Sequence, residues 1–256
     1  SKKKISFNEI NTLPRLIQKK VKLDINRISK KKIKFKYLDF KSIPNIMGIL
    51  NMTPDSFSDG GKYNKKTLAH KQLKYLFNVG ANIVDIGGES TRPGSKAISS
   101  KVELKRLKEV LKRIKKKHII SLDTRKADVM EKGIKQGVKI INDVSGLSYD
   151  RNSINILKKY KMPFILHHSL GNPEVMQNKP KYKNVLLDIY DFFENKIKKF
   201  NRNKIKKKLI LDPGIGFGKN LKHNLMILNK ISIFHSLGFP ILIGTSRKRF
   251  INQISG

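Results

Sequence analysis

The stretch SKVELKRLKEVLKRIKKKHIISLD, residues 100–123, contains the pattern that decides the fold. Its first part repeats apolar residues at helical spacing, which predicts an amphipathic helix over residues 100–117 with Ser100 and Glu103 as a capping box. Its second part, residues 118–122, is a short apolar run, which predicts a buried strand. The stretch therefore predicts a helix, a strand and an acidic residue, Asp123, in immediate succession.

The same pattern recurs along the chain. Further apolar runs occupy residues 45–50, 82–86, 138–141, 162–166, 208–211 and 239–243, and a second amphipathic segment covers residues 184–200. Strands and helices that alternate with short connections form parallel βα units whose helices cover the sheet. The sequence therefore predicts a parallel sheet with a strand at each of these seven runs.

A polar or ionisable residue closes each predicted strand. These residues are Asn51, Asp85, Asp123, Asn142, His167 with His168, Asp212, and Thr245 with Ser246. In an eight-fold βα barrel the carboxyl ends of the strands meet at one mouth, where the active site lies. An open doubly wound sheet gathers only the groups near its crossover, and the first βα turn here lacks a GxGxxG motif. The pattern favours an α/β fold of the (β/α)8 TIM-barrel type, although any one of these residues alone is also suited to a helix N-cap.

Composition limits the class of protein. The chain has 256 residues and no cysteine, which excludes disulfides and thiolate metal sites. Its 56 Lys and Arg residues against 19 Asp and Glu residues give a net charge of +37. Because the lysines are spread along the whole chain, this charge indicates a solvated surface, and we predict no specific nucleic-acid partner. No apolar run approaches the ~18 residues of a membrane span, so we predict a cytoplasmic protein without a membrane partner.

Seven stretches of the sequence resemble one family in their order and spacing. They are IMGILNMTPDSFSDGG (46–61), GANIVDIGGESTRPGS (80–95), SLDTRKADV (121–129), INDVSGL (141–147), HHSLGNPEVMQ (167–177), LILDPGIGFGKN (209–220) and GTSRKRF (244–250). Over about residues 40 to 256 the chain resembles dihydropteroate synthases. The resemblance implies a pterin-binding TIM barrel and a transferase of folate biosynthesis. That reaction joins 6-hydroxymethyl-7,8-dihydropterin pyrophosphate to p-aminobenzoate, giving 7,8-dihydropteroate and pyrophosphate.

The residue types at the predicted mouth suit a pterin ring. A buried carboxylate accepts a pair of adjacent N–H donors, and the amino-pyrimidine edge of a pterin offers such a pair. Asp123, Asn142 and Asp212 are the right types for that edge, and Asp85 is counted with them as a substrate-binding residue.

The Gly-rich segment and the SRK motif add further candidates. Gly216 and Phe217 would let a flat ring lie against their loop, although a Gly-rich loop alone also fits a simple turn. The resemblance makes Lys248 a donor to the ring, whereas without the motif it is equally well one more surface lysine.

The resemblance also assigns the reacting end of the site. It places Asn51 near the pyrophosphate and its Mg²⁺, as the metal ligand, and it makes Asn51, Asp212 and Lys248 the catalytic residues. It places Thr91, Arg92 and Pro93 on a mobile loop over the site, and Ser246 and Arg247 where the p-aminobenzoate carboxylate binds.

The two ends of the chain depart from the family pattern. The family continues beyond the SRK motif with an eighth strand and final helices, which are missing here, so we expect unpaired sheet edges and impaired turnover. We divide the chain into a pterin-binding barrel over residues 45–256 and an N-terminal extension over residues 1–44. The alternation in KKIKFKYLDF (31–40) predicts a strand pair that closes the bottom of the barrel.

Alternative functions stay open at this point. A truncated or degenerate barrel would bind pterin without turnover, and a methyltransferase of similar fold would keep the pterin contacts without the other motifs. The charge also allows a basic nucleic-acid-binding protein. The expected partners are small-molecule substrates, together with a possible homodimer.

Overall fold

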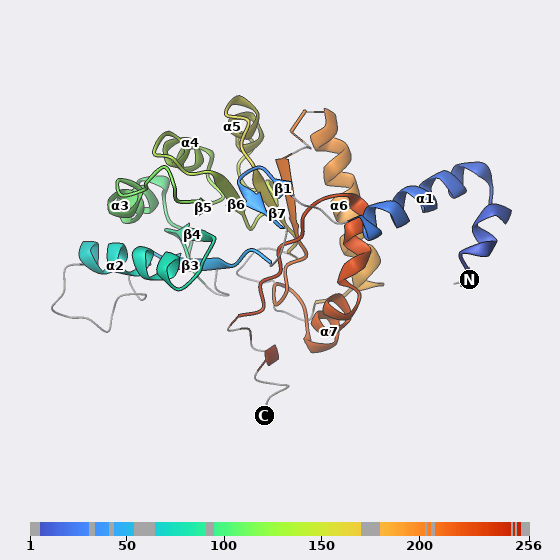
Figure 1. Cartoon of the computed structure of the whole chain (residues 1–256). Coiled ribbons are helices and arrows are strands. Elements are labelled where there is room, and N and C mark those ends of the chain that lie inside the picture. The colour runs from blue at the N-terminus through green and yellow to red at the C-terminus, as the bar shows by residue number, and fades with distance from the viewer. Residues whose placement is uncertain are drawn as a thin grey trace.

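The structure is a computed structural model that describes residues 6–30, 34–40, 44–53, 65–90, 95–169, 180–202, 204–205, 208–246, 248 and 250–251. Within these residues, six parallel strands form one sheet in the order β3-β4-β5-β6-β7-β8, with helices on its outer side (Figure 1). The strands are β3 (Met47–Asn51), β4 (Ile83–Gly87), β5 (Ile120–Asp123), β6 (Ile140–Asp143), β7 (Phe164–His167) and β8 (Leu209–Asp212). The sequential strand order confirms the predicted parallel βα units.

The helices follow the strands in chain order. They are α2 (Lys65–Asn78), α3 (Ser100–Leu111), α4 (Ala127–Lys135), α5 (Ser153–Lys159), α6 (Val185–Arg202) and α7 (Leu221–Asn229), followed by the 3₁₀ helix η4 (Ile231–Leu237). The helix predicted over residues 184–200 is confirmed as α6. Their apolar sides pack on the outward face of the strands to form the main core, which includes Leu107, Met130, Phe164 and Phe193.

Helix α3 begins and ends differently from the prediction. Its N-cap is Ser99, whose extended backbone lets the side-chain oxygen accept the N–H of Val102. Glu103 is fully buried and binds the ammonium of Lys126 at 2.7 Å instead of reaching back to the cap. The capping box predicted at Ser100 and Glu103 is therefore wrong, and α3 ends at Leu111 in place of residue 117.

The seventh predicted strand, residues 239–243, is reduced to a single bridge. Ile241 pairs with Leu211 in parallel. The N–H of Leu211 donates to the carbonyl of Pro240, and the N–H of Leu242 donates to the carbonyl of Leu211. Pro240 has no N–H to extend the ladder, which gives a physical reason for so short a pairing. In the described residues, β3 pairs only with β4.

The inward face of the sheet has an apolar floor. Ile83, Ile140, Ile165 and Ile210 come from four different strands and pack together with Leu38. Leu38 belongs to a short antiparallel hairpin formed by β1 (Lys34–Phe35) and β2 (Leu38–Asp39). Its side chain is 4% exposed. The hairpin thus covers the amino-terminal end of the sheet interior with one inserted side chain.

The N-terminal helices lie to one side of the sheet. The 3₁₀ helix η1 (Asn8–Thr12) leads into α1 (Arg15–Ser29), which extends away from the strands in Figure 1. Helix α1 contacts η4, where the guanidinium of Arg27 donates to the carbonyl of Ser236 at 3.1 Å.

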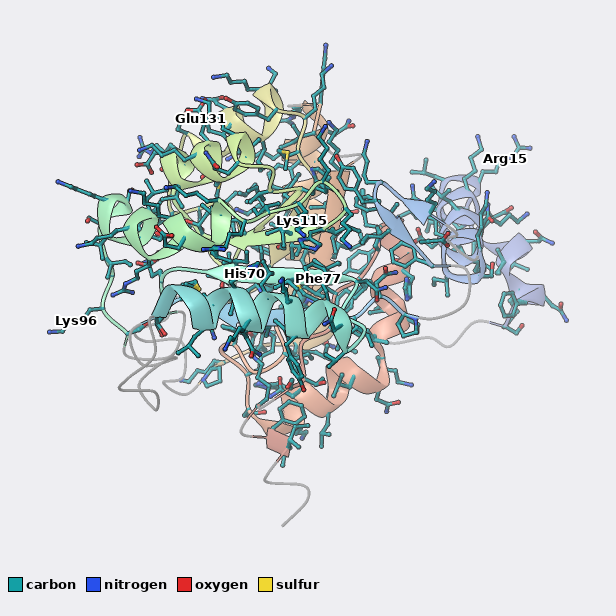
Figure 2. All side chains as sticks on the ribbon, turned by 60° about the vertical axis from the view of Figure 1, so that its left-hand side comes forward. Arg15, His70, Phe77, Lys96, Lys115 and Glu131 are labelled. Atoms are coloured by element: carbon teal, nitrogen blue, oxygen red, sulfur yellow. The ribbon has the colours of Figure 1, made fainter. Side chains whose placement is uncertain are left out.

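Basic side chains point outward on different sides of the molecule. Figure 2 shows Arg15 and Lys96 at opposite sides of the view, both directed away from the ribbon. The charge is therefore not confined to one of these faces. Among the described helices, none combines the length and apolarity needed to cross a membrane.

Replacement of Leu38 by alanine tests the floor. Removing a buried leucine leaves a cavity among the four isoleucines, so we expect the free energy of unfolding to fall by about 2 to 5 kcal/mol. Leu16→Ala is the control, because Leu16 is 83% exposed on α1 and its loss should change stability by less than about 0.5 kcal/mol. Chemical denaturation measures both variants, and equal stability of the two would show that the hairpin does not seal the barrel.

Candidate active site

The strand register brings the predicted polar residues to one end of the sheet. Asp123 pairs with Asn142, and His167 pairs with Asp212. On the other side of Asp123, Gly87 pairs with both Asp123 and Asn51. Asn51, Gly87, Asp123 and Asn142 therefore share one register row. His167 and Asp212 form a separate polar pair on the next two strands, because Asn142 itself pairs with Ile165.

Asn142 of this row also belongs to a group of buried polar side chains. The side-chain N–H of Asn142 donates to Oδ2 of Asp85 at 2.9 Å. Oδ1 of Asp85, Oγ of Ser121 and Oδ1 of Asn142 are buried and have no hydrogen-bond partner in the described part of the chain. Because a buried polar atom without a partner costs about 1–3 kcal/mol, such a group points to a ligand that completes it.

The acidic residues of the site differ in how their surroundings shift their pKa. Burial raises the pKa of Asp85, and the neighbouring Asp212 carboxylate raises it further. Burial also raises the pKa of Asp123 well above its usual range, with added repulsion from Asp85 and other carboxylates. Asp143, which follows Asn142 and faces the other side of β6, has its pKa raised to about 6 by burial. These acids keep their protons to a higher pH than an exposed aspartate does.

Asp212 has the opposite environment. Burial alone would raise its pKa, but His167, the backbone N–H of Gly214 and the charge of Lys219 together lower it. Nδ1 of His167 lies 3.0 Å from Oδ2, and the Gly214 N–H donates to Oδ1 at 2.8 Å. Asp212 is therefore the acid of this group that is best kept as an anion, which suits it to accept paired N–H donors.

An aromatic ring from the loop after β8 lies next to an ammonium group from the SRK motif. The Lys248 ammonium lies 4.0 Å from the centroid of the Phe217 ring. Burial lowers the pKa of Lys248, while Asp212 favours its charged form. Gly216 has a φ of +79°, and a Cβ there would lie 2.9 Å from Cδ of Lys248, so this position requires glycine. The predicted residues Gly216, Phe217 and Lys248 thus form one contact group beside Asp212.

A second lysine, Lys219, binds the backbone of the loop that contains Phe217. The ammonium of Lys219 lies 3.1 Å from Nδ1 of His168 and donates to the carbonyl of Phe217 at 2.9 Å. Lys219 is 4% exposed. Burial lowers its pKa to about 7, and burial lowers the pKa of His168 to about 2. His168 is therefore a neutral acceptor for the lysine at neutral pH.

Asn51 offers an oxygen at the mouth. Its side chain is exposed. A Cβ placed on Gly87 would lie 3.6 Å from Oδ1 of Asn51 and 3.5 Å from Oδ2 of Asp123, so these two oxygens flank the glycine. The described residues contain no group of three or more His, Cys, Asp or Glu side chains suited to a metal ion. An oxygen of Asn51 fits Mg²⁺ that takes its other ligands from water and phosphate, as this ion commonly does.

A charged network fixes the segment that follows β4. Oε1 of Glu89 accepts the backbone N–H of Ile98 at 3.0 Å, and its Oε2 binds Arg125 and Lys126, each at 2.9 Å. Lys126 also binds the fully buried Glu103. The network therefore joins Glu89 and Ile98, which lie on either side of the predicted loop residues in the sequence.

Four predicted site residues fall outside the described residues. They are Thr91, Arg92 and Pro93 of the loop after β4, and Arg247 of the SRK motif. Ser246 is described and its side chain is exposed. The roles predicted for these five residues stay predictions.

Comparison with known proteins agrees with this geometry. Residues 47–256 match the family model described as pterin binding enzyme. The dihydropteroate synthase of Escherichia coli strain K12 is 43% identical over 216 residues, which are 83% of this chain and 76% of the relative. The chain belongs to the dihydropteroate synthase family.

Solved structures of dihydropteroate synthases have the same fold. The enzyme of Clostridium difficile, determined in the presence of pteroic acid, has a TM-score of 0.77 and 41% identity, covering 85% of this chain and 82% of that one. The enzyme of Xanthomonas albilineans with 4-aminobenzoic acid has a TM-score of 0.77 and 35% identity, covering 84% and 77%. The predicted TIM-barrel class and family are confirmed, and the chain is thereby assigned to the transferases of folate synthesis.

Some residues of the site were not assigned from the sequence. Ser121 lies two residues before Asp123, so the strand period already places it on the inward face. Lys219 follows the Gly-rich segment of the dihydropteroate synthase motif, but nothing in its sequence separates it from the many solvated lysines. His167 was noted only as a strand end, and its contact with Asp212 depends on the register of β7 and β8.

The lowered pKa of Lys219 predicts a pH-dependent stability. Its pKa is about 7 in the folded protein against an ordinary value of 10.5. Between these values the unfolded chain binds the additional proton, so the folded state is stabilised as pH rises. We expect the free energy of unfolding to increase by about 1 to 3 kcal/mol more in the wild type than in Lys219→Met between about pH 7 and about pH 9.5.

Urea denaturation at several pH values measures this difference. Lys222→Met is the matched control, because Lys222 is an exposed lysine on the neighbouring helix. Its stability should follow the wild type across the range. Parallel curves for wild type and Lys219→Met would contradict the lowered pKa.

Proposed function

We propose that this chain condenses 6-hydroxymethyl-7,8-dihydropterin pyrophosphate with p-aminobenzoate to give 7,8-dihydropteroate and pyrophosphate. The observation that carries the proposal is the group of buried, unpartnered polar atoms on Asp85, Ser121 and Asn142, next to the anionic Asp212. Related dihydropteroate synthases have been determined with 4-aminobenzoic acid, with pteroic acid and with 7,8-dihydropteroate. A ligand edge rich in donors and acceptors would satisfy these atoms in this chain.

The pterin ring would be recognised both along its hydrogen-bonding edge and on its flat face. Asp212 accepts the adjacent amino and ring N–H donors, while Asn142 and Asp85 bind further along the same edge. Asp123 retains its proton to an elevated pH, so it can donate a hydrogen bond to a ring nitrogen. Phe217 contacts the flat face, and Lys248 donates to the ring beside it.

The reaction transfers the pterin methylene group to nitrogen. The amine of p-aminobenzoate attacks the methylene carbon, the carbon–oxygen bond to pyrophosphate breaks, and the amine loses one proton. Holding both reactants in line and stabilising the charge of the leaving group lower the barrier to such a step. Asn51 lies at the mouth, where the pyrophosphate would project.

Mg²⁺ is the metal that we propose for the site. Asn51 would hold it, and the ion would supply neutralisation of the pyrophosphate charge. We further propose that Thr91, Arg92 and Pro93 cover the bound substrates, on a segment whose base is fixed by Glu89. Ser246 and Arg247 would bind the p-aminobenzoate carboxylate.

We also propose a division of the chain into a catalytic barrel over residues 45–256 and an extension over residues 1–44. The support for a role of the extension is the contact of Leu38 with the floor isoleucines. A homodimer and a cytoplasmic location remain predictions.

Replacement of Asp212 by asparagine tests the site. The amide keeps the size of the side chain but loses the charge and one acceptor oxygen, so we expect pterin binding to weaken by about 1.5 to 3 kcal/mol. Asp191→Asn is the control, because Asp191 is an exposed residue of α6 and its change should leave binding unaltered. Isothermal titration calorimetry with the pterin pyrophosphate measures both.

Formation of 7,8-dihydropteroate from both substrates completes the test. Product that requires both substrates and falls with Asp212→Asn supports the proposed reaction. Pterin binding without product would identify a binding barrel without turnover, and wild-type affinity in Asp212→Asn would remove Asp212 from the pterin site.

A further inference from the structure

His167 occupies a place in the site to which the proposed reaction gives no role. It is the last residue of β7, and it pairs with Asp212 at the end of β8. The two side chains therefore project to the same inward face of the sheet. His167 is only 3% exposed, so its ring belongs to the interior of the site and not to the surface.

The imidazole and one backbone amide together hold both oxygens of Asp212. Nδ1 of His167 lies 3.0 Å from Oδ2, while the N–H of Gly214 donates to Oδ1 at 2.8 Å. An ionised carboxylate can only accept hydrogen bonds, so Nδ1 is assigned as the nitrogen that carries the proton. With one donor on each oxygen, the plane of the carboxylate is fixed before any substrate arrives.

The same ring also contacts the aromatic wall of the site. His167 meets Phe217 edge to face, with ring centroids 4.5 Å apart and an interplanar angle of 84°. Its other nitrogen, Nε2, is buried without a hydrogen-bond partner in the described part of the chain. A Cβ on Gly214 would lie 3.1 Å from Nε2, so the ring is closely covered on that side.

Because Nε2 has no partner among the described residues, the surroundings of His167 satisfy only one of its two ring nitrogens. A buried imidazole with one free nitrogen is less favourable for folding than an apolar side chain of similar size would be. The compensating contacts, to Asp212 and to Phe217, both involve residues of the pterin pocket. This arrangement is the one expected of a side chain that orients a binding group.

We propose that His167 is a positioning residue for pterin recognition, which fixes the carboxylate of Asp212 and the ring of Phe217 in their binding orientations. This inference rests on the proposed function of Asp212. His167 contacts Asp212 and Phe217, to which the proposed function assigns the pterin ring and not the methylene carbon or the amine. Loss of His167 should therefore weaken pterin binding much more than it lowers the rate at which the bound substrates react.

Two substitutions separate orientation from simple space filling. His167→Leu keeps an apolar side chain of similar size but removes the donor to Asp212. His167→Asn places an amide N–H close to the position of Nδ1 and so retains a donor. For His167→Leu we expect the Kd and the KM for the pterin pyrophosphate to rise by about ten-fold or more, with kcat changed less than about two-fold.

The second substrate and the conservative variant provide the controls. The KM for p-aminobenzoate should stay at its wild-type value in both variants, because Ser246 and Arg247, which we propose for its carboxylate, lie in a different segment from the Asp212 and Phe217 that His167 contacts. His167→Asn should recover most of the pterin affinity. A leucine variant with wild-type affinity, an asparagine variant that loses as much as leucine, or a loss in kcat alone would each overturn the proposal.

Nuclear magnetic resonance tests the arrangement without any substrate. The ¹⁵N shifts of the His167 ring should show a proton on Nδ1 in the wild type, and Asp212→Asn should change them. If the wild type shows this tautomer but binds no pterin, the proposed function fails while the His167–Asp212 contact stands. If the proton resides on Nε2 alone, the positioning role fails even where pterin binds.

Discussion

The structure depends on four strands whose inward-facing side chains change from apolar to polar between one inward position and the next. Side chains on one face of a strand recur every two residues, so two successive inward positions form two layers of the barrel interior. The pairs, in floor-then-mouth order, are Ile83 and Asp85, Ile140 and Asn142, Ile165 and His167, and Ile210 and Asp212. The isoleucine floor excludes water, and the polar layer above it is therefore desolvated on one side by the same packing that stabilises the fold.

Desolvation alone would drive every acid of this layer toward its neutral form, yet the acids differ. Burial and neighbouring carboxylates raise the pKa of Asp85 and Asp123, while His167, a backbone N–H and the charge of Lys219 lower the pKa of Asp212. The interior thus contains both a strong acceptor and acids that hold their protons to a higher pH than an exposed aspartate does. A heterocycle edge that alternates donors and acceptors requires such a mixture, and a uniformly charged pocket would not match it.

The sequence predicted best those features that depend on residues close together in the chain. Strand ends, the helix over residues 184–200 and the polar residue after each strand follow from periodicity, and these place most of the site. The seventh strand failed to extend because Pro240 interrupts the ladder, and the cap of α3 moved to Ser99 because Glu103 is engaged by Lys126. His167 and Lys219 were missed as functional residues because their partners, Asp212 and His168, lie on other elements and are set by register and burial.

The floor of the barrel joins residues that are far apart in the chain. Leu38 lies before the region shared with the family, residues 47–256, and it packs against Ile210 near the other end of that region. During synthesis on the ribosome the hairpin emerges before the barrel strands, whereas the last isoleucine of the floor emerges only after most of them. Contacts of such long range form slowly because a long loop must be closed before they contribute. The full set of contacts around Leu38 can therefore be completed only after β8 has been synthesised.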